Sequence, residues 1–289
     1  MILITGATGQ LGRLVIAQLL KTLPANRIVA AVRNPAKAQD LEALGIQVRL
    51  GDYEQPGHWP AALQGVEKVL LISASDIGAR VAQHKVVIDA VKASGTVTFI
   101  AYTSMLRADT CRIPFASEDR ETEQMIVASG KPFVFLRHGW YTENYVMNAE
   151  HAVQSGELYG AAGAGRISGA SRADYAEAAA TVLTSGERLQ SIYELAGDSS
   201  FTLADVAAEL AKQSGRSVHY VDLPEAAYQQ LLVSFELPEL VATALALADT
   251  GVANGDVYSE RQDLSRLIGR DTTPLGVVVA SALARGAAS

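Results

Sequence analysis

The feature that most constrains the fold is a glycine-rich turn near the start of the chain, between a short apolar run and an amphipathic segment. "ILIT" is rich in β-branched residues, "GATGQLG" follows it directly, and "QLGRLVIAQLLK" continues with apolar residues at helical spacing. These apolar positions are Leu11, Leu14, Val15 and Leu19. A strand that passes through such a turn into a helix is typical of a βαβ unit in a parallel sheet.

The glycines of this turn recur at every third position, as Gly6, Gly9 and Gly12. Gly6 permits a tight turn, Gly9 lets the backbone approach a pyrophosphate closely, and Gly12 lets the helix pack against the strand. The first turn of the helix also offers free N–H groups and a partial positive charge to phosphate. We therefore expect a dinucleotide to bind here, through residues Gly6, Thr8, Gly9, Gln10, Leu11 and Gly12.

The rest of the first half alternates strands with helices. Apolar runs predict strands at residues 27–32, 46–50, 68–73, 97–104 and 133–137. Between them the sequence predicts helices at about 36–44, 58–65, 80–95 and 116–130. Because the strands are continuous apolar runs rather than alternating ones, both of their faces are expected to be buried. The predicted fold class is therefore α/β, with a Rossmann-type doubly wound parallel sheet.

After residue 137 the pattern becomes mostly helical. Helices are predicted at 141–156, 172–186 and 202–215, the last with Thr202 as its N-cap, and small helices run from 224 to a final one near 274–285. Short strands are predicted near 191–196 and at 217–223. We expect a nucleotide-binding domain at 1–140 and a smaller, mostly helical domain at 141–289, interleaved because the strand near 191–196 returns to the first sheet.

Composition argues against several other classes of protein. The 289 residues are 49 % hydrophobic and 19 % charged, as in ordinary globular proteins, and no apolar run reaches the length of a membrane span. The net charge of −7 argues against nucleic acid as a partner. Cys111 is the only cysteine and the five histidines lack metal-ligand spacing, so we expect no disulfide, no metal site and a cytoplasmic location. The sequence leaves the oligomeric state open.

A second glycine cluster, "GAAGAGRISGAS" at residues 160–171, invites the same interpretation as the first. No buried strand is predicted before it, and no amphipathic helix is predicted to begin at its last glycine. We expect a flexible loop at the mouth of the site instead.

The second predicted strand ends on Arg33, 21 residues after Gly12. An acidic residue there would bind the 2′-hydroxyl of NAD and repel the additional phosphate of NADP, whereas an arginine offers that phosphate a planar fork of donors. The alternative is that Arg33 is only a solvated residue before the turn at "NP". We interpret Arg33 as the residue that selects NADP(H).

Other strand ends point to the same edge, because open α/β sheets bind ligands at the carboxyl ends of their strands. The further candidates for cofactor binding are Asp52, Tyr53, Ser73, Ala74, Ser75, Tyr102, Thr103, Arg137, Gly139, Trp140 and Tyr141. Asp52 has an alternative as a helix cap, and Trp140 and Tyr141 have one as packing between domains. His138 either contacts the cofactor or is a solvated or buried histidine.

Several of these stretches resemble one family. "ITGATGQLG", "VRNPAKA", "FIAYTS", "FLRHGWYTENY" and "YELAGDS" are similar to the NmrA-like branch of the atypical short-chain dehydrogenases, and within it to the bacterial NADPH-dependent quinone oxidoreductases, with triphenylmethane reductases as near relatives. The resemblance spans the chain and implies an NADP(H)-binding Rossmann domain with a small helical C-terminal domain. It also implies that the nicotinamide lies near Trp140, Tyr141 and Asn144. Relatives carry a histidine where this chain has Asp119, so no role of that histidine transfers.

The absence of one motif indicates which reactions the chain can catalyse. None of the ten tyrosines is followed by a lysine four residues later, so the Tyr-x-x-x-Lys pair that protonates a ketone is absent. A quinone can accept hydride without such an acid because its product is a phenolate-like anion, and a cationic triarylmethane dye needs no proton. The predicted walls of the acceptor pocket are Trp140, Tyr141, Asn144, Met105 and Phe115, of which Met105 and Phe115 have an equal alternative as core residues.

The sequence therefore favours an NADPH-dependent enzyme that reduces quinone-like small molecules by direct hydride transfer, in a pocket without a proton donor of its own. Two alternatives stay open. One is a regulatory protein that senses NADP(H) without catalysis, and the other is a reductase of triarylmethane dyes or other xenobiotics.

Overall fold

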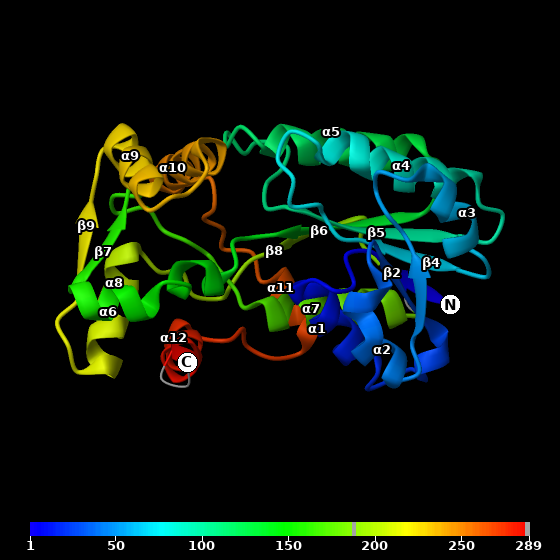
Figure 1. Ribbon diagram of the computed structural model, residues 1–289, viewed down its shortest axis with the longest axis horizontal. Coiled ribbons are helices and arrows are strands. Elements are labelled where there is room, and N and C mark those ends of the chain that lie inside the picture. Colours follow the sequence, from blue (N-terminus) through cyan, green and yellow to red (C-terminus); the bar gives the residue numbers. More distant parts are fainter. Residues whose placement is uncertain (187–188, 287–289) are drawn as a thin grey trace.

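A parallel sheet of seven strands forms the larger part of the molecule (Figure 1). The computed structural model describes residues 1–186 and 189–286. The strand order is β3-β2-β1-β4-β5-β6-β8, with bounds β1 (Ile2–Ile4), β2 (Ile28–Val32), β3 (Gln47–Leu50), β4 (Lys68–Leu71), β5 (Phe99–Met105), β6 (Phe133–His138) and β8 (Ile192–Leu195). This is the predicted doubly wound order, and the direction of winding reverses between β1 and β4.

Helices cover both faces of this sheet, as Figure 1 shows. One face carries α3 (Trp59–Ala62), α4 (Arg80–Ala93) and α5 (Ala116–Ala128), and the other carries α1 (Gln10–Leu19), α2 (Gln39–Ala43), α7 (Arg172–Thr184) and α11 (Asp263–Ile268). Ile2 and Ile4 pack toward α1 and α7, whereas Leu3 packs toward α3 and α4. Because successive strand residues point to opposite faces, β1 must be apolar throughout, as the sequence predicts.

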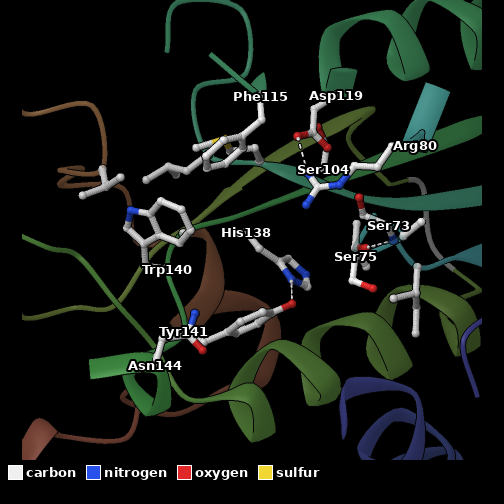
Figure 2. Close-up of a pocket in the computed structure, with 17 residues that line it drawn as sticks. Ser73, Ser75, Arg80, Ser104, Phe115, Asp119, His138, Trp140, Tyr141 and Asn144 are labelled. Atoms are coloured by element: carbon white, nitrogen blue, oxygen red, sulfur yellow. Dashed lines mark hydrogen bonds and ion pairs between the residues drawn. The ribbon is translucent and has the colours of Figure 1, made fainter. Parts of the chain in front are cut away.

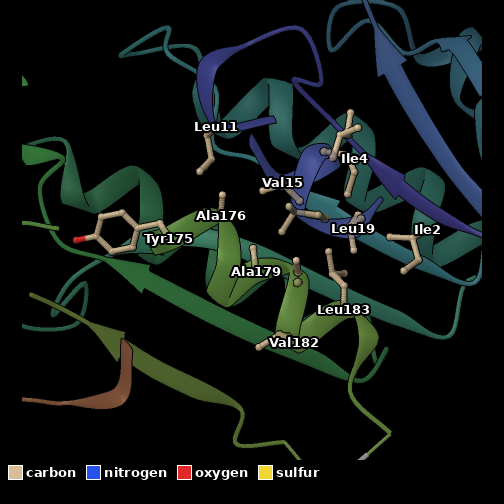
Figure 3. Close-up of a cluster of buried hydrophobic side chains, with 14 of the residues drawn as sticks. Ile2, Ile4, Leu11, Val15, Leu19, Tyr175, Ala176, Ala179, Val182 and Leu183 are labelled. Atoms are coloured by element: carbon tan, nitrogen blue, oxygen red, sulfur yellow. The ribbon is translucent and has the colours of Figure 1, made fainter. Parts of the chain in front are cut away.

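Helix α7 completes the lower face of the sheet by packing closely on α1. In Figure 3, Leu11, Val15 and Leu19 of α1 lie against Ala176 and Ala179 of α7, whose small side chains permit the close approach. The sequence had placed this helix in the second domain. The structure shows α7 and α11 packed on the large sheet beside β8, whose return to this sheet the sequence predicted, and α7 supplies the partner helix that the apolar face of α1 needs.

A second hydrophobic core lies at the other end of the molecule. Its elements are α6 (Ala149–Ser155), α8 (Leu203–Ser214), α12 (Leu275–Gly286) and a two-stranded parallel sheet of β7 (Glu157–Gly160) and β9 (His219–Asp222), with α9 (Glu225–Ser234) and α10 (Glu239–Ala253) beside them. The predicted cap is confirmed, since the Thr202 side chain accepts from the Asp205 amide and Asp205 reciprocates. Strand β7 was missed because its four residues are largely polar or partly exposed.

The second glycine cluster runs beside the site and is closely packed in its second half. Strand β7 leads into it, and residues 167–171 are buried. Ile167 pairs with Phe201, and Ala170 pairs with Tyr141. A Cβ on Gly165 would lie 2.4 Å from the carbonyl oxygen of Val252, so the small residues permit backbone segments to pack closely.

Two kinds of feature are not found in the described residues. Within residues 1–186 and 189–286, no helix is both long and apolar enough to cross a bilayer. In the same ranges, no group of His, Cys, Asp and Glu side chains is arranged to hold a metal ion.

Candidate active site

The glycine loop between β1 and α1 has the geometry that phosphate binding requires. Gly6 has a φ of +56°, and the Gly9 amide donates to the Gly6 carbonyl at 2.9 Å. A Cβ on Gly12 would lie 2.4 Å from that same carbonyl oxygen, so any larger residue would push α1 away from the strand. The first turn of α1 holds no acidic side chain. Its N–H groups, which have no acceptor within the helix, are therefore suited to bind phosphate.

Arg33 follows β2 directly and is exposed. Within the part of the chain that the structure describes, it makes no hydrogen bond or ion pair, so its donors are available to a ligand. The neighbouring segment is held in place by Arg13, which donates to the carbonyls of Thr8 and Lys37 and pairs with Asp40. Arg13 thus joins the glycine loop to the segment after Arg33, a link that sequence reasoning missed.

A cavity of about 290 Å³ opens at the carboxyl ends of β4, β5 and β6 (Figure 2). All five residues predicted to form the acceptor pocket line it: Met105, Phe115, Trp140, Tyr141 and Asn144. Some of the predicted cofactor residues line it too: Ser73, Ala74, Ser75, Thr103 and Gly139. Strand ends, loop and cavity therefore meet at one edge of the sheet, although the assignment of individual residues to cofactor or acceptor stays a prediction.

One wall of the cavity is aromatic. The rings of Phe115 and Trp140 meet edge to face, with centroids 6.1 Å apart, and Met105 packs in the same cluster. Such rings offer apolar faces to a flat ligand. This wall is suited to hold an aromatic or quinonoid ring.

The floor of the cavity carries His138 and Tyr141. His138 stacks on Tyr175 with centroids 4.4 Å apart, and its Nδ1 lies 3.5 Å from the Tyr141 hydroxyl. Burial lowers the pKa of His138 to about 3, so the ring is neutral at physiological pH. Burial also raises the pKa of Tyr141 to about 12, so its hydroxyl keeps its proton. Neither group exchanges a proton readily near pH 7.

Asn144 is oriented by an arginine. Its Oδ1 accepts from Arg172 Nη2 at 2.6 Å, and the same guanidinium lies 4.4 Å from the centre of the Tyr141 ring. Because a guanidinium only donates, the oxygen of the amide must face Arg172. The Asn144 nitrogen is then left to donate to a carbonyl oxygen of a ligand.

In the described ranges, eight buried polar side-chain atoms lack a hydrogen-bond partner, and four of them belong to residues that line this cavity. These four are Ser73 Oγ, Arg80 Nε, His138 Nε2 and Trp140 Nε1. Buried polar groups are almost always hydrogen-bonded, and exceptions are concentrated where a ligand binds. These atoms fit a ligand that brings carbonyl, amide and hydroxyl groups, as a nicotinamide nucleotide and a quinone both do.

Arg137, a predicted cofactor residue, has its guanidinium surrounded by carboxylates. Its side chain is buried, makes a two-point contact with Glu123 at 2.8 and 2.9 Å, and also pairs with Glu194 at 2.8 Å. Asp109 adds a carboxylate at 3.2 Å. With its donors occupied, the guanidinium supports the end of β6 and has no capacity left for phosphate.

Three other predicted cofactor residues have structural roles. The Tyr53 hydroxyl donates within the sheet, 2.7 Å from Thr5 Oγ1 and 2.9 Å from the Ile72 carbonyl. Asp52 accepts a hydrogen bond from the Glu54 amide at 3.0 Å and so caps a turn. This role is similar to the helix cap that the sequence left open as an alternative. Tyr102 lies in the core under α4 and α5 and does not line the cavity.

Sequence reasoning also missed two charged residues that line the cavity, Arg80 and Asp119. Asp119 is only 4 % exposed, and burial raises the pKa of its carboxyl to about 6. The sequence predicted a pocket without a proton donor of its own, and the structure places the Asp119 carboxyl in the wall of that pocket. A signal was present, because Asp119 shares one face of its predicted helix with Thr122, Glu123 and the apolar Ile126.

Known proteins match this chain over almost its whole length. A model of the NmrA-like family matches residues 1–275. Quinone oxidoreductase 2 of Escherichia coli is 53 % identical over 275 residues, 95 % of this chain and 96 % of that protein. An NAD(P)H azoreductase of Xenophilus azovorans is 31 % identical over 85 % of both chains.

Solved structures agree with these matches. The E. coli NADPH-dependent quinone oxidoreductase in complex with NADPH superposes with a TM-score of 0.95 and 52 % identity, over 98 % of this chain and 100 % of that one. A Citrobacter sp. triphenylmethane reductase in complex with NADP(H) gives a TM-score of 0.94 at 36 % identity, over 98 % and 100 % of the two chains. The resemblance seen in the sequence is confirmed, and the chain belongs to the NmrA-like family.

Proposed function

We propose that this protein is an NADPH-dependent quinone oxidoreductase. The observation that carries the proposal is an aromatic-walled cavity at the carboxyl edge of the sheet, beside a glycine loop shaped for a dinucleotide. The E. coli relative, at 53 % identity, is named a quinone oxidoreductase, and its structure was solved with NADPH, which supports the proposal.

Different residues of the chain bind different parts of the nucleotide. The amides of the first turn of α1 hold the pyrophosphate, and Arg33 pairs with the 2′-phosphate that distinguishes NADPH from NADH. When bound, NADPH supplies a hydride. Asn144, oriented by Arg172, donates to a carbonyl oxygen in the cavity.

The acceptor lies in the same cavity. Phe115, Trp140 and Met105 pack against its ring and exclude water, which keeps hydride donor and acceptor in contact. A quinone is favoured because its reduced anion is aromatic and weakly basic, so the Tyr-x-x-x-Lys pair is not required.

Oxidation of NADPH in the presence of 1,4-benzoquinone tests the proposal. We expect steady NADPH consumption, followed at 340 nm, that depends on enzyme and quinone, with at least about tenfold lower kcat/KM for NADH. The controls are the reactions without enzyme and without quinone. Tight NADPH binding with no oxidation by any of several quinones would favour the sensor alternative instead.

A triarylmethane dye is the second candidate acceptor, favoured by the 36 % identity with the Citrobacter reductase. Such a dye is a flat cation that accepts hydride at carbon, and the same aromatic wall accommodates it. The two acceptors should be compared by kcat/KM under one set of conditions. A higher value for a dye than for every quinone tested would reverse the assignment.

We also propose that the protein works in the cytoplasm on a small molecule, without nucleic acid. NADPH is a cytoplasmic reductant, Cys111 is the chain's only cysteine, and the net charge is −7. Fractionation of cells that express the protein tests the location.

A further inference from the structure

We propose that Asp119 is a catalytic residue of this enzyme, the general acid that donates a proton to the reduced acceptor. The inference rests on the proposed function, since it concerns the second half of quinone reduction. It replaces the expectation of a pocket without a proton donor of its own.

The position of the carboxyl group is the first support. Asp119 lies in the first turn of α5, lines the cavity and is almost fully buried. Figure 2 shows it opposite the floor formed by His138 and Tyr141, with Arg80 beside it. A proton on this carboxyl would therefore be inside the cavity and shielded from solvent.

The hydrogen bonds of Asp119 leave one oxygen for a ligand. The Tyr102 hydroxyl donates to Oδ1 at 2.6 Å from the core side, where Tyr102 does not line the cavity. Oδ2 faces the guanidinium of Arg80 at 4.0 Å, beyond hydrogen-bond distance. Within the described residues no hydrogen bond reaches Oδ2, so this oxygen can carry a proton to an acceptor.

Arg80 makes the same end of the cavity suitable for a quinone oxygen. Its guanidinium has a weak pair with Asp119, lies 5.8 Å from the centre of the Phe115 ring, and has a buried Nε without a partner. A developing oxyanion near these donors is stabilised. The oxygen that must receive a proton is thereby drawn toward Asp119.

Other titratable groups near Asp119 do not compete for this role. His84, on α4, is neutral because burial, and to a smaller extent the charge of Arg80, lower its pKa to about 3. Its Nε2 accepts a hydrogen bond from the Ala74 amide. On α5, Glu123 is bound to Arg137, and Glu118 accepts from the Gly78 amide. Across the cavity, His138 and Tyr141 keep their neutral forms, as described above.

The pKa of Asp119 is suited to donation near neutral pH. Burial is the largest influence and raises this pKa to about 6. The hydrogen bond from Tyr102 and the positive charge of Arg80 lower the pKa, whereas the negative charges of Glu123 and Glu118 raise it. An apolar acceptor that displaces the remaining water would raise it further. The carboxyl can thus be protonated before the reaction and ionised after it.

The proposed step balances. The acceptor gains a hydride, which is two electrons and one proton. As negative charge develops on the acceptor oxygen, the O–H bond on Asp119 Oδ2 breaks and an O–H bond forms on that oxygen, so the product is a neutral hydroquinone. The carboxylate left behind recovers a proton from solvent before the next turnover, so one proton from solvent is consumed per quinone.

The test begins with Asp119→Asn, which keeps the shape and the acceptor for Tyr102 but cannot supply the proton. For the wild type we expect kcat/KM for 1,4-benzoquinone to be highest below pH 6 and to fall as pH rises through about 6. In the variant this dependence should vanish, with kcat/KM at pH 6 reduced about 10- to 100-fold. Glu121→Gln, an exposed charge loss on the same helix, is the matched control.

Tyr102→Phe provides a second test, because a purely structural role of Asp119 would leave the midpoint of the pH profile unchanged in this variant. Loss of its hydrogen bond removes an influence that lowers the Asp119 pKa, so the midpoint of the pH profile should shift upward. Infrared titration of the protein without nucleotide supplies a readout apart from activity. Carboxyl absorption with a midpoint near 6 should be equal in the wild type and Glu121→Gln and lower in Asp119→Asn, in which only Asp249, whose pKa burial also raises to about 6, still contributes.

The outcomes separate the two proposals. Quinone turnover with the same pH dependence in wild type and Asp119→Asn overturns the role of Asp119 and leaves the quinone oxidoreductase intact. No turnover of any quinone by the wild type overturns the proposed function, and the role of Asp119 falls with it. Loss of the pH dependence only in Asp119→Asn, together with the upward shift in Tyr102→Phe, supports the inference.

Discussion

The glycine loop and the acceptor cavity share one edge of the sheet but are built in opposite ways. The loop consists of consecutive residues 6–12 and offers mainly backbone amides. The cavity is built from side chains on β4, α4, β5, α5, β6 and the segments that follow them. The comparison teaches that a site made of backbone can be encoded locally, whereas a site made of side chains depends on how distant elements pack.

The largest expected effect concerns the ion pairs that Arg137 makes at the end of β6. Arg137→Met should lower the free energy of unfolding by about 3–5 kcal/mol, because it leaves the buried Glu123 and the half-buried Glu194 without their cation. Urea unfolding measures this change. The matched control is Arg27→Met, which removes the exposed ion pair with Glu67 and should cost less than about 1 kcal/mol. Unchanged stability with a weakened NADPH affinity would restore the original interpretation of Arg137.

The next effect concerns the loop. Gly12→Ala should raise the Kd for NADPH on the order of 100-fold, because its Cβ would lie 2.4 Å from the Gly6 carbonyl oxygen and displace the first turn of α1. Fluorescence of bound NADPH measures the affinity. Gly95→Ala serves as the control, since its Cβ would meet nothing within 4 Å. Equal affinities in the two variants would show that the loop does not hold the nucleotide.

The smallest effect concerns cofactor choice. Arg33→Asp should reduce the ratio of NADPH to NADH efficiency about 10- to 100-fold and so reverse the preference, because it removes charge-assisted bonds to the 2′-phosphate and adds repulsion. Arg33→Met should give an intermediate ratio, since it removes the attraction alone. The ratio is obtained from kcat/KM with each nucleotide. An unchanged ratio in Arg33→Asp would leave Arg33 as a solvated residue.

Much of the fold was readable because its signals are local. The sequence predicted every strand of the large sheet, and its parallel, doubly wound character followed from the continuous apolar runs of the central strands. The outer strands β3 and β8 contain polar residues and are only partly buried. Strand β7 was missed, since a short edge strand with exposed residues lacks that signal. The packing of α7 on α1 was also missed, because two alanine-rich or apolar helix faces do not reveal which partner they meet.

The candidate site was readable only in part. The rule that ligands bind at strand ends led to Trp140 and Tyr141, which line the cavity, but equally to Tyr102, which does not. Successive residues of a strand point to opposite faces, so a place at the strand end leaves the direction of the side chain open. Asp119 was recognised as a departure from the family pattern, yet its burial beside the cavity required the packing of α5.

The amino-acid sequence by itself determined the parallel sheet, the phosphate-binding turn and the family, because each depends on the spacing of residues close together in the chain. Tertiary structure decided which charges serve the site. It buried Arg137 among three carboxylates and placed Asp119 with Arg80 at the cavity. Electrostatic roles depend on distance and burial, and only the packing of distant elements sets those quantities.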